Sequence, residues 1–179
     1  MSVITPVRSG SNVIIHAGTS SNGKIQRTNN GLDASPTWSD VTGTFPVGNV
    51  SDIAADPGSP LRVFATRGAF GDYKLWRSTT GGTTWTGVGV GLPNVPANSV
   101  AIDPVDTNRI FVGTDVGVYQ SLDGGNNFQP LMNGMPLGNV VTDLEVDNSP
   151  HALVAGSCGR GAWWLDLDLP WDLIFRDGF

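Results

Sequence analysis

The fold of this chain is decided by the stretch Ser121-Leu122-Asp123-Gly124-Gly125-Asn126-Asn127-Phe128. It follows the alternating run Gly117–Gln120, a pattern that is typical of a short β-strand. Its acid, glycines and closing aromatic predict a tight polar turn, because glycine adopts positive φ at little steric cost. Ser78–Trp85 repeats the pattern, and Thr28–Trp38 is a copy stretched by an insertion. The turn is therefore one part of a repeat.

The strand patterns around this turn also recur. One is found at Val50–Asp56, Asn98–Asp103 and Val141–Asp147. A second is found at Asn12–Thr19, Leu61–Thr66, Arg109–Thr114 and His151–Ser157. A third is found at Lys74–Ser78, Gly117–Ser121 and Gly161–Leu165, with a weaker copy at Gly23–Thr28. A fourth strand is expected to begin at Trp38, Trp85 or Phe128. The period is roughly 45 residues, the size of a four-stranded propeller blade.

The repeats predict an all-β fold, a β-propeller built from blades of four antiparallel strands. The expected units are residues 1–45, 46–92, 93–138 and 139–170, followed by a tail at 171–179. The first unit is expected to be partial or weak, and the last to lack the polar turn and the fourth strand. The tail is expected to form another edge strand or a docking segment.

Three architectures are compatible with about four repeat units of this size. The chain closes as a four-bladed ring, with Val3–Val7 supplying the missing strand of the last blade. Alternatively, it forms an open arc that pairs with another copy, or it is the C-terminal part of a larger propeller. The sequence leaves all three open.

Composition narrows the classes of partner. The chain has 179 residues, a formal net charge of −6 and no cluster of basic residues, so no nucleic-acid partner is expected. No apolar run reaches the ~18 residues of a membrane span, so membrane insertion is not expected. Met1–Pro6 has neither the basic flank nor the apolar core of a signal peptide. The compartment therefore stays open.

The spacing Ser121-x-Asp123-x-Gly125-x-x-Phe128 resembles the Asp-box, or BNR, repeat. A second copy at Ser78–Trp85 has Thr80 in place of the acid. Such repeats occur in sialidases, sortilin ectodomains, xyloglucan-hydrolysing endoglucanases and photosystem assembly factors. The resemblance implies a β-propeller, suggests an extracellular or periplasmic location, and does not single out one of these functions.

In such a repeat the turn residues are expected to be structural, with the acid accepting backbone N–H bonds and the aromatic packing between neighbouring sheets. The positions concerned are Ser78, Gly82, Trp85, Ser121, Asp123, Gly125 and Phe128.

Asp143 and Glu145 are the weak candidates for catalysis. Glu145 is the only glutamate in the chain, and Ala54 and Ala101 stand at its repeat position. Residues two apart on a strand share a face, so both carboxylates would lie on one side of the sheet. Glycosidases place two carboxyls ~5–9.5 Å apart, usually on separate elements, whereas these would project in parallel. Asp52 is equivalent to Asp143, which favours a repeat role, and no catalytic residue is assigned.

Arg67, Phe70 and Tyr73 form the candidate ligand-binding loop, because a cation and two aromatics suit sugar stacking and hydrogen bonding. An ordinary exposed hairpin explains the same residues. Of Trp163 and Trp164, adjacent residues on opposite faces, at most one is free for a ligand, and Trp164 is the candidate.

Two further chemistries find no support. Sialidase chemistry is not expected, because the arginines are dispersed over the units. His16 and His151 have no second ligand at zinc spacing, so neither a metal nor another cofactor is expected.

The sequence therefore favours a non-catalytic binding or assembly module that presents loops or strand edges to a protein or glycan partner. The alternative is a fragment of a glycoside hydrolase, similar to an endoglucanase or xyloglucanase, acting with inner-strand carboxylates. Association with further copies, or with the remainder of a larger propeller, is a third expectation.

Overall fold

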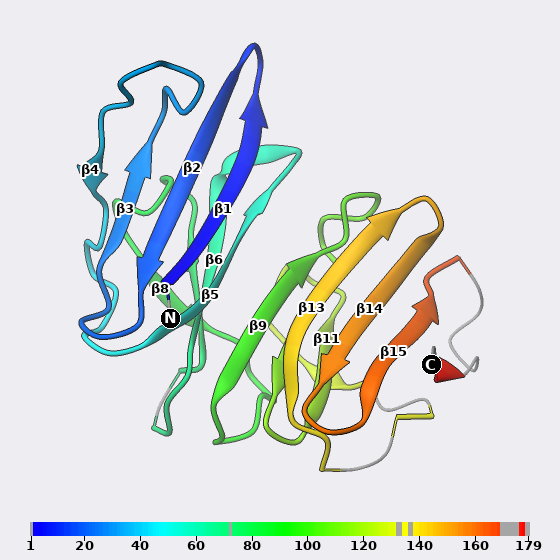
Figure 1. Cartoon of the computed structure of the whole chain (residues 1–179). Helices are drawn as coiled ribbons and strands as arrows, with labels where there is room; N and C mark the ends of the chain where they lie inside the picture. Colours follow the sequence, from blue (N-terminus) through cyan, green and yellow to red (C-terminus); the bar gives the residue numbers. More distant parts are fainter. Residues whose placement is uncertain (1, 72, 132–133, 136–137, 169–175, 178–179) are drawn as a thin grey trace.

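The computed structural model describes residues 2–71, 73–131, 134–135, 138–168 and 176–177. In these residues, sixteen β-strands form four antiparallel sheets of four strands each (Figure 1). The sheets are arranged as the blades of a four-bladed β-propeller. The predicted all-β fold is confirmed.

Each sheet is built from consecutive strands. The first contains β1 (Ser2–Ser9), β2 (Asn12–Thr19), β3 (Ile25–Thr28) and β4 (Ser39–Asp40). The second contains β5 (Val50–Asp56), β6 (Ser59–Arg67), β7 (Leu75–Ser78) and β8 (Thr86–Val88). The third contains β9 (Ala97–Ile102), β10 (Ile110–Thr114), β11 (Gly117–Ser121) and β12 (Gln129–Pro130). The fourth contains β13 (Val141–Asn148), β14 (His151–Ser157), β15 (Gly161–Asp166) and β16 (Arg176–Asp177).

The first sheet is complete, so of the two expectations for the first unit, partial or weak, the partial one does not apply. Val3–Val7 lies in β1 and pairs with β2, with Val3 opposite Gly18 and Val7 opposite Ile14. It therefore does not complete the last sheet. Pro6 is tolerated because β1 is an edge strand, where one side needs no backbone N–H donor.

The last sheet also has a fourth strand, so residues of the tail form the edge strand that was one of its two expected roles. Trp163 pairs with Asp177 and Trp164 with Arg176, so residues of the predicted tail supply β16. This short pairing has no pattern that sequence reading detects. Trp171, in the same tail, lies outside the described residues.

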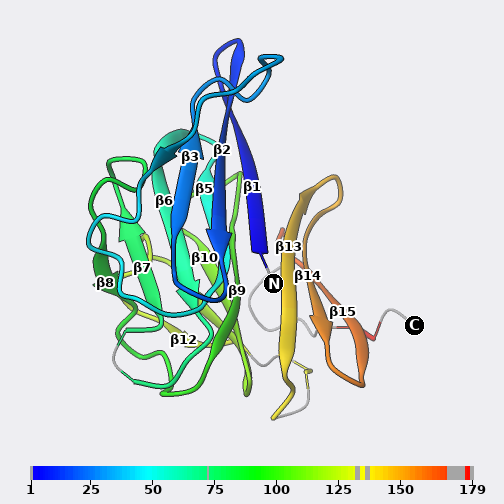
Figure 2. The same cartoon turned by 60° about the vertical axis from the view of Figure 1, so that its left-hand side comes forward.

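The innermost strands β1, β5, β9 and β13 follow one another around the molecule (Figures 1 and 2). Each makes extensive contacts with the next, and no comparable contact joins β1 to β13 within the described residues.

Three apolar clusters hold successive sheets together. Ile25 and Trp85 lie in the cluster between the first and second sheets, Phe64 in the next, and Phe111 and Leu153 in the cluster between the third and fourth. Burying each such side chain contributes about 1.5–3 kcal/mol, so the contacts between sheets carry much of the stability. The described residues contain no helix that could cross a membrane.

Candidate functional site

The polar turn at Ser121–Phe128 is closed by its own side chains. The Ser121 hydroxyl accepts hydrogen bonds from the backbone N–H groups of Gly125 (2.9 Å) and Asp123 (3.3 Å) and donates to Asp123 Oδ1 (2.7 Å). Asp123 Oδ1 accepts the N–H groups of Asn126 (3.0 Å) and Asn127 (2.9 Å). The bonds from Asn127 and then from Ser121 lower the pKa of Asp123 to about 2. The hydrogen bonds of the Asp123 Oδ1 atom are therefore made within the turn.

Close packing explains why residue 125 of this turn is a glycine. Gly125 has a φ of 88°, and a Cβ there would lie 2.8 Å from the ring of Phe64 in the neighbouring sheet. Phe128 is buried in the same cluster as Phe64.

The second polar turn uses a hydroxyl where the first has a carboxylate. Ser78 Oγ accepts the N–H groups of Gly82 (2.8 Å) and Thr80 (3.1 Å), and Thr80 Oγ1 accepts that of Thr84 (3.0 Å). The indole N–H of the buried Trp85 donates to the Val41 carbonyl at 3.1 Å. Ser78 and Thr80 thus close the second polar turn from within.

Arginines join the polar turns of neighbouring sheets. Arg27 Nη1 donates to the Gly81 carbonyl, and Arg77 Nη1 donates to the Gly124 carbonyl, each at 2.9 Å. Each arginine directly precedes the first hydroxyl residue of its own turn. Sequence reasoning missed this role, although the repeated position of the arginine was its signal.

A second series of hydrogen bonds joins the innermost strands. Asp52 Oδ2 accepts the Ser99 hydroxyl (2.8 Å) and the Val100 N–H (2.9 Å), across from β5 to β9. Ser99 Oγ in turn accepts the Leu144 N–H of β13 at 3.0 Å. On the other side, the hydroxyl of Thr5 donates to the Ile53 carbonyl at 2.5 Å. A polar residue on each of β1, β5 and β9 thus bonds the inner strand that follows.

These strands surround a hollow of about 380 Å³, which we call the axial hollow. Its lining consists of Ile4, Thr5, Pro6, Asp52–Ala55, Val100–Ile102 and Asp143–Val146. The size is in the range of small-molecule sites, and the walls mix apolar side chains with carboxylates.

Asp52 is the most constrained carboxylate of the axial hollow. Burial raises the pKa of Asp52, although its hydrogen bonds with Val100 and Ser99 oppose the rise. The nearby charge of Asp143 raises the pKa further. Because Asp52 already accepts these bonds, few of its lone pairs remain for a ligand.

Asp143 and Glu145 are both exposed at the axial hollow. Asp143 Oδ1 accepts the N–H of the next residue, Leu144, at 3.0 Å. No hydrogen bond joins the Glu145 carboxylate to another of the described residues. The structure therefore brings the two predicted candidates together, and Asp52 adds a third acid that sequence reasoning had placed only as a repeat position.

The predicted ligand-binding residues do not form one site. Arg67 Nη2 donates to the Val47 carbonyl at 3.4 Å, and Tyr73 packs edge-on against Trp76 with ring centroids 5.9 Å apart. Phe70 is 70 % exposed on the same loop. Trp164 lies on β15 in the fourth sheet, whereas the other three residues belong to the second sheet and its loop.

A second hollow of about 400 Å³ adjoins this loop and is lined by Tyr73, Lys74, Gly89 and Leu92. Lys74 is buried there, and its ammonium donates to the Asn94 side chain at 2.8 Å and to the Gly71 carbonyl. Among the residues that the structure describes, no cluster of three His, Cys, Asp or Glu side chains could hold a metal ion.

Comparison with protein-family models and with curated proteins gives no match. Solved structures do match. The GH74 enzyme of Niastella koreensis superposes with a TM-score of 0.69 at 22 % identity, covering 92 % of this chain and 28 % of that chain. The GH74 xyloglucanase of Xanthomonas campestris gives 0.64 at 20 % identity, covering 90 % and 29 %.

The extracellular domain of a proposed hybrid two-component system of B. thetaiotaomicron gives a TM-score of 0.66 at 13 % identity, covering 96 % of this chain and 21 % of that chain. This chain thus spans between a fifth and a third of the length of each of these structures. At these identities the likeness concerns the propeller fold.

Proposed function

We propose that this chain is a non-catalytic carbohydrate-binding module, with the axial hollow as its glycan site. The observation that carries this proposal is the unequal state of the three carboxylates. Asp52 is engaged in bonds between strands, whereas Asp143 and Glu145 are exposed on one strand. Ionised carboxylates accept hydrogen bonds from sugar hydroxyls, and these two act from the same side.

Charge and shape define the class of glycan. The carboxylates of the axial hollow repel uronic acids and sulfated sugars, so the ligand is a neutral polysaccharide. Ala54, Ala101 and Ile4 offer apolar surface to the C–H faces of a sugar ring. The polar turns support including the chain among the Asp-box repeat proteins as part of this proposal.

The test is titration calorimetry with soluble xyloglucan and with a mixed-linkage β-glucan. Glu145→Gln is expected to weaken binding about tenfold, since a hydrogen bond to a charged group contributes about 1.5–3 kcal/mol. Asp147→Asn is the matched control, because Asp147 is an exposed acid on the same strand outside the lining of the axial hollow. Equal affinities of the wild type and Glu145→Gln would refute the proposal.

Glycoside hydrolysis is the second candidate. Two observations favour it: burial raises the pKa of Asp52, as suits a general acid, and two of the similar structures are GH74 enzymes. In this alternative Asp52 donates a proton to the glycosidic oxygen, and Asp143 or Glu145 activates water. Release of reducing sugar that disappears in Asp52→Asn and in Glu145→Gln would establish it. Binding without any release supports the non-catalytic module.

A further inference from the structure

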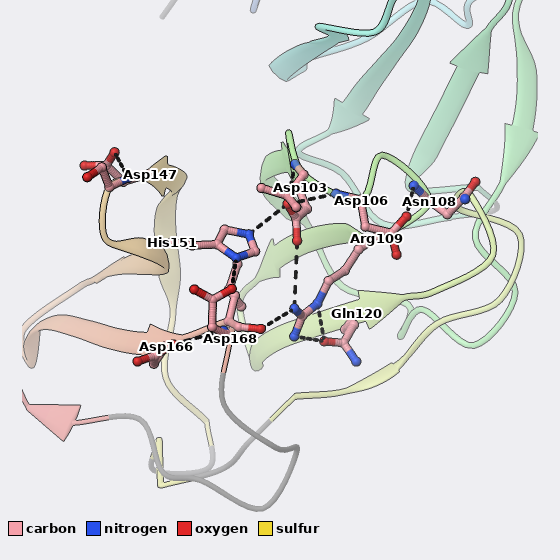
Figure 3. A network of polar contacts seen from close by, with 12 residues as sticks. Asp103, Asp106, Asn108, Arg109, Gln120, Asp147, His151, Asp166 and Asp168 are labelled. Carbon is pink, nitrogen blue, oxygen red and sulfur yellow. Dashed lines mark hydrogen bonds and ion pairs between the residues drawn. The ribbon is translucent and has the colours of Figure 1, made fainter.

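A network of charged side chains joins the third and fourth sheets (Figure 3). At its centre is His151, the first residue of β14, between one carboxylate from each sheet. Its Nε2 lies 2.9 Å from Oδ1 of Asp103, which follows β9. Its Nδ1 lies 2.6 Å from Oδ1 of Asp168, which follows β15. The side chain of Asp103 is 1 % exposed and that of Asp168 is 72 % exposed.

The geometry fits a charged ring. An ionised carboxylate only accepts hydrogen bonds, and only the imidazolium form of histidine has an N–H on both nitrogens. A neutral His151 would turn a lone pair towards one of the two carboxylates. Asp103 Oδ1 also accepts hydrogen bonds from the Val105 N–H (2.8 Å) and the Asp106 N–H (3.2 Å).

The network contains further charged groups. Arg109 Nη1 is 3.8 Å from Asp103 Oδ2 and donates to the Leu167 carbonyl at 3.3 Å, so it also connects the two sheets. The remaining charged residues drawn in this network are acids, namely Asp106, Asp147 and Asp166 (Figure 3). Two carboxylates thus contact the imidazole directly, and the Arg109 guanidinium is connected to it through Asp103.

We propose that His151 is a pH-dependent connection between the third and fourth sheets. The protonated ring binds Asp103 and Asp168 together, and loss of its proton breaks one of these contacts. Because β13 carries Asp143 and Glu145 in the same sheet as His151, the change loosens one wall of the axial hollow. The connection does not depend on saccharide binding.

The direction of the pH effect follows from linkage. Burial lowers the pKa of His151, but the bonds with Asp168 and Asp103 outweigh burial and raise it above the ordinary value. A pKa raised by folding stabilises the folded state fully below the unfolded value of about 6.5. That stabilisation is lost as the pH rises through the folded pKa.

The first experiment is an NMR titration of the imidazole signals of the intact chain. His16 and His151 are the only histidines, so His16→Gln assigns both signals. The titration midpoint of His151 is expected above that of a model peptide, and to fall in Asp168→Asn but not in Asp33→Asn, which removes an exposed acid outside the network. A His151 midpoint at or below about 6.5 would overturn the proposal.

The second experiment measures urea unfolding midpoints between about pH 6.5 and about pH 9, where His151 is the histidine that titrates. The wild-type urea midpoint is expected to fall as the pH rises over this range. In His151→Gln the fall is expected to be smaller, because glutamine has no proton to lose. Parallel curves for the two proteins contradict the connection. If His151→Gln does not fold, the comparison of Asp168→Asn with Asp33→Asn replaces it.

Discussion

His16 occupies the position that Phe64 and Phe111 fill in the next two sheets, directly opposite the residue before each turn hydroxyl. It is fully buried, and its Nε2 lies 3.3 Å from the Gly81 carbonyl. Among the described residues, its Nδ1 has no hydrogen-bond partner. A neutral ring with its proton on Nε2 satisfies this arrangement, so His16 serves as a packing residue with one polar contact.

Burial lowers the pKa of His16 to about 4, and the charge of Arg27 acts in the same direction against the Gly81 bond. A histidine pKa lowered by folding stabilises the protein above about pH 6.5, and the effect is lost as the pH falls towards 4. We therefore expect wild type to lose about 2–3 kcal/mol between pH 7 and pH 4.5 from this residue. In His16→Gln this loss should be absent from unfolding curves measured at the two pH values. An equal loss in both proteins would show that His16 is not the cause.

The polar turns close their own hairpins and also connect neighbouring sheets. Each turn offers a glycine carbonyl, at Gly81 or Gly124, to an arginine of the preceding sheet. The conformation is fixed by backbone N–H bonds to one serine, so the carbonyl points in a reproducible direction. The acid of the turn rigidifies this arrangement.

Thr80→Asp should complete the second polar turn. Thr80 now accepts the Thr84 N–H, whereas Asp123 in the equivalent position accepts two backbone N–H groups. A carboxylate bonded by a further N–H should stabilise the protein by about 1 kcal/mol, which thermal unfolding would register as a higher Tm. Thr79→Asp places the same charge one residue earlier, at an exposed position, and serves as the control. A Tm of Thr80→Asp no higher than that of the control would contradict the equivalence of the two turns.

At the scale of the molecule, the repeat could be predicted because its signals are local. The turn pattern and the short apolar strands place β5–β12 within a few residues, and β4, β8 and β12 each begin one residue after the predicted aromatic. Val3–Val7 was expected only as a strand that completes the last sheet, whereas β1 belongs to the first, and β16 could not be located in the tail because a two-residue strand has no periodicity.

The axial hollow could be predicted only in part. Glu145 stood out because it departs from the repeat. The bonds of Asp52 to Ser99 and of His151 to Asp103 join residues 47 and 48 positions apart. Such contacts form only when the sheets pack against each other, so no spacing in the sequence predicts them.

The hydrogen bonds between the innermost strands run from each strand to the next one along the chain. This order predicts that two aspartates at equivalent repeat positions contribute differently to stability. Asp52 of β5 accepts a hydroxyl and an N–H from β9, but Asp143, at the same repeat position in β13, has no following sheet within the described residues. Asp52→Ala leaves Ser99 and Val100 without an acceptor in a buried place, which should cost about 2–4 kcal/mol. Asp143→Ala removes an exposed side chain and should change stability by less than about 0.5 kcal/mol. Urea midpoints followed by tryptophan fluorescence measure both, and similar losses in the two variants would mean that the series does not hold the sheets together.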